Sequence, residues 1–336
     1  MDIMKKLTYI VWLTFISLQY GQNKVGTTAA EFLTIPVGAK AVAMGGAFVA
    51  VADDITAAFW NPAGLSLLSN NEFNVNYSDW LLDLKHSWVG VGVKISDNDY
   101  VAVSVINMNY GAEPITTVDY PEGTGETWDA ADLAIYLSYS HNLTDRFSVG
   151  GSVKYIHQRI WNESASTFAF DVGLLFKTQM KGFNIGMSIS NFGKEMQLDG
   201  NDLLRPIDID QSYNYNNSVI TSTLSTDKWE IPLVFSVGGA WELGLIENLG
   251  FLVAFDAKVP NNQNTYLNLG GELQWNDLFF IRGGRSCLFK ERAQEGLTFG
   301  AGIKYLISGL KLSVEYAFLD FGEWNNLNRF SISIGF

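Results

Sequence analysis

Residues 329–336 read RFSISIGF, and these last eight residues decide the fold. Apolar residues stand at every second position, from Phe330 to Phe336, and the positions between them hold Arg, Ser or Gly. In an extended chain successive side chains point to opposite faces. A period of two over eight residues therefore predicts a β-strand with one apolar face and one small, polar face.

The same alternation recurs upstream, most clearly at 311–318, 297–305 and 168–176. Segments of roughly ten residues with this pattern are typical of strands that cross a bilayer as part of a barrel. Bacterial single-chain barrels have an even number of strands. We count fourteen such segments: 72–80, 86–95, 99–108, 131–140, 147–157, 167–177, 183–192, 231–241, 249–258, 266–275, 278–286, 296–307, 311–318 and 328–336.

The connections between these segments alternate in length. Every second one is brief (96–98, 142–146, 178–182, 242–248, 276–277, 308–309), as periplasmic turns are. The longer ones are 109–130, 158–166, 193–230, 287–295 and 319–327. A soluble β-sandwich, the main alternative, has no reason to alternate in this way. The predicted fold is all-β: a transmembrane antiparallel β-barrel of about 14 strands with an N-terminal plug of short helices and extended segments.

Composition agrees with a lipid-facing protein. Hydrophobic residues make up 47% of the 336 residues and charged residues only 17%, whereas soluble domains have about 25% charged residues. The net charge of −13 argues against nucleic acid as a partner. The single cysteine, Cys287, excludes an intramolecular disulfide and a Cys-based zinc site, and we expect it in a loop without a special role.

The first 21 residues resemble a secretory signal peptide. Lys5 and Lys6 precede a short apolar run from Leu7 to Leu18, and Gly21 suits a cleavage position. No later segment reaches about 18 uninterrupted apolar residues, so we expect no membrane-spanning helix. These features predict export to the bacterial outer membrane.

One stretch differs from the rest: residues 36–65, PVGAKAVAMGGAFVAVADDITAAFWNPAGL. It is rich in Ala and Gly and ends in a turn that Pro62 makes rigid. The predicted inner faces of the strands are also small, with pairs such as Gly150 and Ser152 or Gly300 and Gly302. Because a wide barrel with small inner residues must hold water, ligand or a plug, we predict a plug over residues 22–70 and a barrel over 71–336.

Short helical pieces are expected within the plug. Thr28 followed by Glu31 has the spacing of a capping box, which predicts a helix that begins near Thr27 and continues to Phe32. Asp53 and Asp54 stand where a helix N-terminus favours negative charge, a structural role. Two adjacent acids alone make a poor metal site.

The plug stretch resembles the N-terminal segment of the PorV/PorQ family, within the FadL-like superfamily of outer-membrane channels. The resemblance rests on Gly38-Ala39, Met44-Gly45-Gly46-Ala47-Phe48, Ala52-Asp53-Asp54 and Trp60-Asn61-Pro62-Ala63-Gly64-Leu65. It implies a fourteen-stranded barrel with an N-terminal plug. It also implies one of two functions. PorV-type members of the type IX secretion system bind exported proteins with C-terminal signal domains at the cell surface. FadL-type members take up fatty acids or other hydrophobic molecules.

The Asn61-Pro62-Ala63 turn is common to both branches, so both functions stay open, beside a purely structural barrel. Expected partners are outer-membrane lipid, the barrel-assembly machinery, and either secreted proteins and other secretion subunits or hydrophobic small molecules. The plug residues expected to be structural or to lie next to a ligand are Gly45, Gly46, Asp53, Asp54, Asn61, Pro62, Ala63 and Gly64.

Two further sites are predicted. Phe336 ends the last strand, and by resemblance such an end is read by the assembly machinery. The polar segment 193–230 is either a solvated outer loop or a partner-binding surface, with Asp208, Asp210, Tyr213 and Tyr215 as candidates. His86, His141 and His157 are scattered, and no nucleotide-binding or zinc-protease motif is present. We therefore expect no enzyme, no metal and no cofactor.

Overall fold

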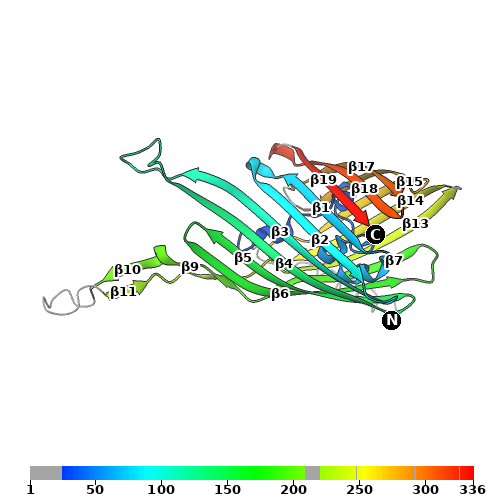
Figure 1. The fold of residues 1–336 in the computed structure, drawn as a ribbon, viewed down its shortest axis with the longest axis horizontal. Coiled ribbons are helices and arrows are strands. Elements are labelled where there is room, and N and C mark those ends of the chain that lie inside the picture. The colour runs from blue at the N-terminus through cyan, green and yellow to red at the C-terminus, as the bar shows by residue number, and fades with distance from the viewer. Residues whose placement is uncertain (1–24, 209–219, 247, 291–292, 325) are drawn as a thin grey trace, which may run out of the picture.

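The computed structural model describes residues 25–208, 220–246, 248–290, 293–324 and 326–336. It is a closed antiparallel barrel of fourteen strands (Figure 1), as predicted. The barrel strands are β1 (Glu72–Asp79), β2 (Lys85–Lys94), β3 (Asp99–Pro114), β4 (Thr127–Thr144), β5 (Phe147–Ile160), β6 (Glu163–Lys177), β7 (Phe183–Gly193), β13 (Val234–Ile246), β14 (Leu249–Pro260), β15 (Tyr266–Trp275), β16 (Phe279–Leu288), β17 (Leu297–Ile307), β18 (Leu310–Asp320) and β19 (Asn326–Gly335).

The first and last strands close the barrel. β1 pairs with β19 from Glu72 opposite Gly335 to Asp79 opposite Asn328. Apart from this closure, neighbouring barrel strands are also neighbours in the sequence, except that β7 pairs with β13, because the strands between them belong to a long connection. The fourteen segments with alternating residues therefore match the fourteen barrel strands one for one.

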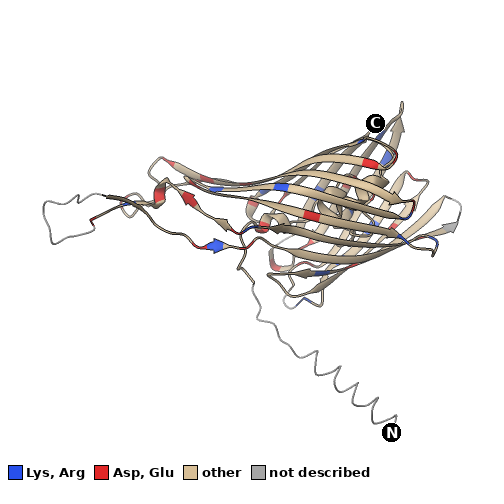
Figure 2. Cartoon of the chain, turned by 90° about the horizontal axis from the view of Figure 1, so that it is seen from below, with Lys and Arg blue, Asp and Glu red and all other residues tan. Residues whose placement is uncertain are grey.

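The apolar face of each strand points outward. On β19, Phe330 is 53% exposed whereas the next residue, Ser331, is 2% exposed. This arrangement is the reverse of that in a soluble protein and is stable only when lipid covers the outer face. Figure 2 shows long stretches of strand without charged residues.

The two ends of the barrel differ. The brief turns 95–98, 145–146, 178–182, 276–278 and 308–309 lie at the end where the chain also terminates, and this end faces the periplasm in bacterial barrels. The opposite, extracellular end carries the connections 115–126, 194–233 and 261–265.

One predicted loop is wrong. β5 continues to Ile160 and β6 begins at Glu163, so only Trp161 and Asn162 connect them instead of residues 158–166. Beyond the bilayer water covers both faces of a strand, so apolar alternation ends before the strand does. There, hydrogen bonds such as His157 Nδ1 to Ser166 Oγ (2.8 Å) link the paired strands.

The long connection between β7 and β13 has structure of its own. It holds β8 (Met196–Gln197), β9 (Asp199–Gly200), η4 (Asn201–Leu203), β10 (Leu204–Ile207), β11 (Ile220–Thr223) and β12 (Lys228–Trp229). β10 pairs with β11, and β12 pairs with β8. The β10–β11 hairpin projects well away from the barrel in both views (Figures 1 and 2). We call residues 194–233 the arm.

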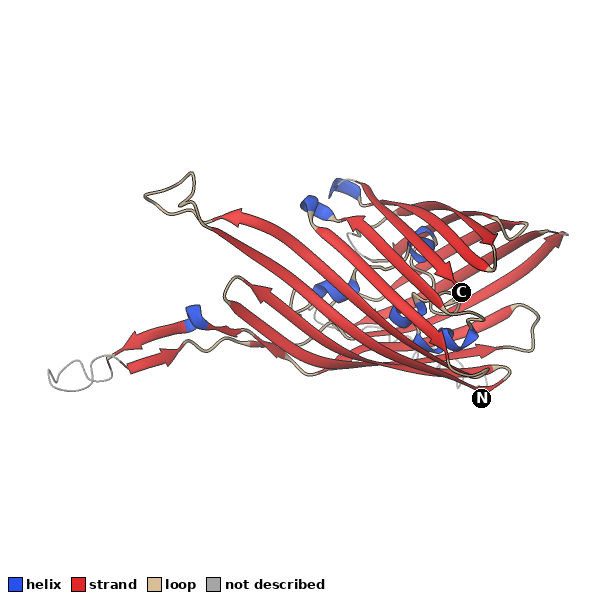
Figure 3. Ribbon diagram, in the orientation of Figure 1, coloured by secondary structure: helices blue, strands red, loops and turns tan. Residues whose placement is uncertain are grey.

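Short helices lie before and within the barrel (Figure 3): η1 (Glu31–Thr34), α2 (Ala39–Ala43), α3 (Ala57–Trp60) and η2 (Pro62–Leu67). Two more, η3 (Leu81–Asp83) and η5 (Gly322–Trp324), lie in extracellular connections. No helix within the described ranges is long and apolar enough to cross a bilayer.

The helix predicted from Thr27 begins later than expected, at Glu31. Ala30 adopts a left-handed conformation (φ 55°), which prevents a helix from passing through it. The Thr28 hydroxyl donates to the Glu31 carboxylate, and the Ala29 N–H donates to Glu230 O of the arm (2.8 Å). Pairing with the arm therefore replaces the predicted cap.

Candidate functional site: the plugged lumen and its mouth

Residues 29–68 fill the interior of the barrel. Their path begins at the extracellular mouth, where Thr28 lies beside Glu230 in the arm, and ends at the periplasmic end, where Asn71 exchanges two backbone hydrogen bonds with Phe336. α2 packs against β16 to β19, and η2 packs against β3 to β6. Most side chains between Val37 and Leu65 are buried.

Gly45 and Gly46 place the plug backbone directly on the wall. Both have positive φ angles, 66° and 73°. A Cβ atom at Gly45 would lie 2.6 Å from Leu269 O, so no larger residue fits. Ser286 Oγ donates to Gly45 O (3.0 Å), and Asn268 Nδ2 donates to Gly46 O (3.2 Å). These glycines therefore fasten the plug to β15 and β16.

Asp53 and Asp54 have different roles. Asp53 forms an ion pair with Lys40 Nζ (2.6 Å). Asp54 Oδ1 accepts from the backbone N–H of Thr56 (2.8 Å), in the turn that leads into α3. Although the Asp53 side chain is half-exposed to a cavity inside the barrel, the surrounding protein would raise its pKa, but the Lys40 ammonium outweighs this and holds the pKa of Asp53 below its ordinary value. Burial and then the Asp53 carboxylate raise the pKa of Asp54 to about 6.

Asn61 links three parts of the molecule. Its side chain is 0% exposed. Nδ2 donates to Val49 O within the plug (2.8 Å) and to Leu174 O on β6 (3.0 Å), and Oδ1 accepts from Ala63 N–H (3.2 Å). The side-chain amide of Asn61 therefore hydrogen-bonds two segments of the plug to β6 of the barrel wall.

The rest of the motif packs tightly against glycines. A Cβ atom at Gly150 would lie 2.4 Å from Pro62 C, and one at Gly173 would lie 2.1 Å from Asn61 Oδ1. Gly64 itself faces Ala52 O, 2.2 Å from where its Cβ atom would be. Small residues on the plug and on the barrel wall allow the two backbones to approach each other closely. This close approach explains why the segment Asn61-Pro62-Ala63-Gly64 consists of small or compact residues.

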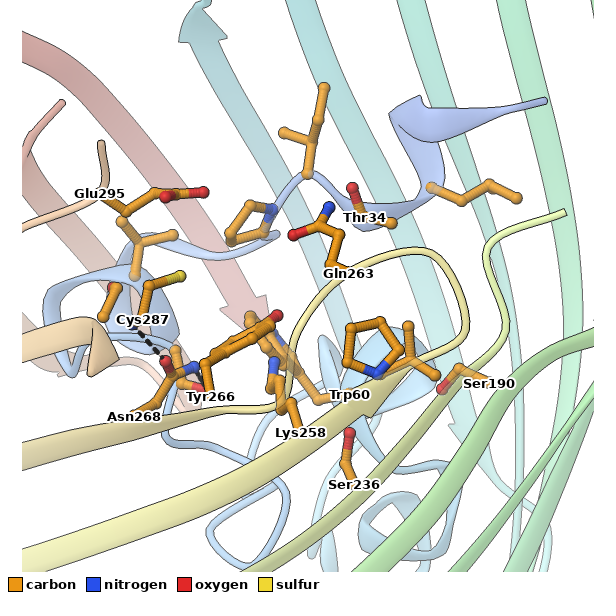
Figure 4. Close-up of a pocket in the computed structure, with 18 of the residues that line it drawn as sticks. Thr34, Trp60, Ser190, Ser236, Lys258, Gln263, Tyr266, Asn268, Cys287 and Glu295 are labelled. Atoms are coloured by element: carbon orange, nitrogen blue, oxygen red, sulfur yellow. Dashed lines mark hydrogen bonds between the residues drawn. The ribbon is translucent and has the colours of Figure 1, made fainter. Parts of the chain in front are cut away.

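A cavity of about 160 Å³ lies above the plug at the extracellular mouth (Figure 4). Its apolar lining includes Leu33, Ile35, Phe59, Trp60, Tyr266 and Phe321. The Lys258 ammonium lies 4.3 Å from the centre of the Trp60 ring, and the Trp60 indole N–H donates to Val37 O (2.9 Å). No described carboxylate forms an ion pair with Lys258. Among the described residues, the cavity thus combines aromatic surface with one lysine, Lys258, that has no ion-pair partner.

Cys287 lines this cavity, and its predicted place in a loop is wrong. It lies near the end of β16, is 9% exposed, and adopts φ 54°. Its backbone N–H donates to Asn268 Oδ1 (2.9 Å). The left-handed conformation bends the strand end, which is why alternation did not extend to it.

A second cavity, of about 130 Å³, lies at the periplasmic end and has charged walls. Lys40 and Asp53 of the plug meet Arg282 and Glu315 of the barrel there. Arg282 forms ion pairs with Glu272 (2.5 Å) and Glu315 (3.1 Å). α2 separates this cavity from the mouth cavity, since Lys40 lines one and Val42 the other.

A family model described as "Type IX secretion system protein PorV" matches residues 18–210, more than half of the chain. The chain belongs to the PorV family. The resemblance seen in the plug stretch is thereby confirmed, and with it an outer-membrane barrel of the type IX secretion class. Among curated proteins, none has a significantly matching sequence.

Solved structures share the fold of this PorV family member. A Pseudomonas aeruginosa FadL homologue is 12% identical with a TM-score of 0.54, over 90% of this chain and 98% of that one. The CymD monoaromatic hydrocarbon channel (12%, TM-score 0.56) covers 90% and 97% of the two chains. The P. putida toluene transporter TodX (12%, TM-score 0.55) covers 89% and 96%. At such low identity these likenesses show the fold alone.

The other predicted sites fall at the two ends of this barrel. Phe336 is 52% exposed, and its backbone continues the sheet by pairing with Asn71. Asp208 is half-buried at the end of the β10–β11 hairpin, whereas Asp210, Tyr213 and Tyr215 lie outside the described residues. The roles proposed for all five residues stay predictions.

Sequence reasoning missed the charged inner wall. Lys154 and Asp171 form a buried ion pair (2.7 Å), and Asp256 Oδ2 accepts from the N–H groups of Phe48 (2.8 Å) and Val49 (3.0 Å). The sequence does place these charged residues at the inward-facing positions of the alternating strands. Their partners could not be read from the sequence, since the plug supplies them.

Proposed function

We propose that this PorV-type barrel holds exported proteins at the cell surface, with the arm as the receiving surface. The observation that supports this is the filled lumen. Plug residues from Val37 to Leu65 pack against the wall on both sides, so a polypeptide has no way through the barrel. Such a barrel suits a receptor for exported proteins better than a pore for them.

The arm offers a suitable surface. It carries exposed apolar side chains on and beside paired strands: Leu204, Ile207, Ile220, Leu224 and Trp229. A loop that projects beyond a rigid barrel is where recognition is expected. The arm is also bonded to the plug, through Ala29 N–H to Glu230 O, so cargo bound there stays next to the mouth.

Deletion of residues 205–222 tests this proposal. Leu204 is paired with Thr223, so two glycines can rejoin the chain without disturbing the barrel. We expect normal folding, judged by heat-modifiable gel migration, but at least a tenfold loss in capture of an exported protein that bears a C-terminal signal domain. The matched control replaces another extracellular loop, 115–126, with two glycines. Unchanged capture by the arm deletion would contradict the proposal.

The mouth cavity supports a second candidate, binding of a hydrophobic small molecule. An apolar cavity of about 150 Å³ is sufficient for benzene, so this one has room for a single ring rather than for a whole long-chain fatty acid. Two of the structural neighbours are named as a monoaromatic hydrocarbon channel and a toluene transporter.

Equilibrium dialysis with labelled toluene tests the second candidate. We expect the purified barrel to bind toluene and the cavity-filling variant Ser236→Phe to lose binding, because Ser236 lines the cavity. Val237→Phe, on the outward face of the same strand, is the control. Equal toluene retention by all three proteins would point to detergent partitioning and dismiss this candidate.

A further inference from the structure

Four basic and four acidic side chains line the cavity of about 130 Å³ at the periplasmic end. Only half of these groups neutralise one another directly. Lys40 forms an ion pair with Asp53 (2.6 Å), and Arg282 forms one with Glu315 (3.1 Å). Four lining groups have no ion-pair partner among the described residues: Lys304, Lys311, Asp54 and Glu72. The cavity is therefore left with two unpaired basic groups and two unpaired acidic groups.

The strand register keeps the basic groups apart from Glu72. Lys311 of β18 is paired with Gly335 of β19, and Gly335 is paired in turn with Glu72 of β1. Neighbouring strands lie about 4.8 Å apart, so the Cα atoms of Lys311 and Glu72 are separated by roughly 10 Å. Gly335 contributes no side chain between them. The space that a larger residue would fill belongs to the cavity instead.

The two unpaired groups of each sign repel each other. The Lys311 ammonium acts against the charge of Lys304, which lies on the neighbouring strand β17. The plug supplies Asp54, which acts in the same way against Glu72. Asp54 Oδ1 accepts from Thr56 N–H (2.8 Å), whereas no donor on a described residue contacts Oδ2. A carboxylate beside the lysines and an ammonium beside the acids would relieve both repulsions.

We propose that this cavity binds a small zwitterion, a short amino acid with a primary ammonium and a carboxylate. Its carboxylate would accept from Lys304 and Lys311, and its ammonium would donate to Asp54 and Glu72. A simple anion or cation would leave one of the two pairs without an opposite charge.

The ligand would enter from the periplasm. α2 separates this cavity from the mouth cavity. The wall strands β17, β18, β19 and β1 are paired without a register shift, so a lipid headgroup has no way in from the bilayer. The proposed site is therefore independent of cargo binding at the arm and of hydrocarbon binding at the mouth.

Equilibrium dialysis of the full-length barrel with labelled β-alanine tests the proposal. Propionate lacks only the ammonium group of β-alanine, and ethylamine lacks only its carboxylate. We expect β-alanine to bind at least about tenfold more tightly than either, because each lost charge-assisted contact weakens binding by about that factor. Propionate or ethylamine binding as tightly as β-alanine would overturn the proposal, and so would the absence of β-alanine binding.

Substitutions at the two ends of the site assign the binding to this cavity. Lys311→Met and Glu72→Gln should each weaken β-alanine binding at least about fivefold. Glutamine keeps an acceptor for the Ile55 N–H that Glu72 now binds, and heat-modifiable gel migration checks that both variants fold. Lys85→Met is the control, because Lys85 is an exposed lysine at the extracellular end of β2. Unchanged affinity in either Lys311→Met or Glu72→Gln would refute the assignment.

Discussion

The plug is held to the barrel in two different ways: by direct packing on glycines, at η2 and also at Gly45 and Gly46, and by ion pairs beside a cavity around Lys40. η2 contacts Gly150 of β5 and Gly173 of β6 by its backbone, and Ser140 Oγ of β4 donates to Ala63 O (2.9 Å). Around Lys40, charged side chains line a cavity between plug and wall. Contact without intervening space is rigid, because packed atoms cannot shift independently. Ion pairs beside a cavity are weaker and depend on salt. We therefore expect the side near η2 to stay fixed and the side near Lys40 to move first.

The largest effect is expected from Gly150→Val. Its Cβ atom would meet Pro62 C at 2.4 Å, and neither backbone can yield. We expect a loss of more than about 4 kcal/mol of stability, seen as a near-complete loss of the folded band in heat-modifiable gels. Gly151→Val is the matched control, because the nearest atom to its Cβ would lie 3.4 Å away. Equal yields for both variants would contradict rigid contact at η2.

Asn61→Leu comes next. The leucine fills similar space but leaves Val49 O and Leu174 O without their donor. An unsatisfied buried group costs about 1–3 kcal/mol, so a loss of about 3 kcal/mol and a lower yield of folded barrel are expected. Asn98→Leu, in a periplasmic turn, should unfold at the wild-type temperature. If Asn61→Leu migrates like the wild type at every temperature, the Asn61 amide does not contribute to holding the plug on the barrel wall.

Lys40→Met should cost less, about 1–2 kcal/mol, because Asp53 is half-exposed and Glu272 keeps Arg282 as a partner. The effect should be local. Hydrogen exchange at the backbone N–H groups of α2 should become faster, while that at η2 should not change. Faster exchange over the whole plug would show that the two sides act as one unit.

The smallest effect is that of salt on the wild-type barrel. At 1 M salt the screening length is about 3 Å, so the Lys40 side should loosen slightly and protease cleavage within 36–56 should increase up to about twofold. Cleavage within 60–68 should stay the same. If salt increased cleavage only within 60–68, the η2 side and not the Lys40 side would be the weaker contact between plug and barrel.

The strands were predictable because the bilayer imposes a simple rule. Every second residue must face lipid, and fourteen segments obey that rule over their membrane-facing part. The rule fails where water covers both faces, which is why the connection 158–166 turned out to be mostly strand. The arm was harder still, since its short strands β8 and β12 pair only with each other across about thirty residues of sequence, from Gln197 to Lys228.

The sequence by itself determined the barrel, its strand count and the family, because alternation and the plug stretch are local patterns. The tertiary structure alone decided which polar residues meet inside: Asn61 with Leu174 O, Lys40 with Asp53, and Arg329 with His86. The physical reason is that closing a barrel brings distant strands and the plug into one small volume. There each buried charge needs a neighbour, and strand order together with register decides which one is within reach.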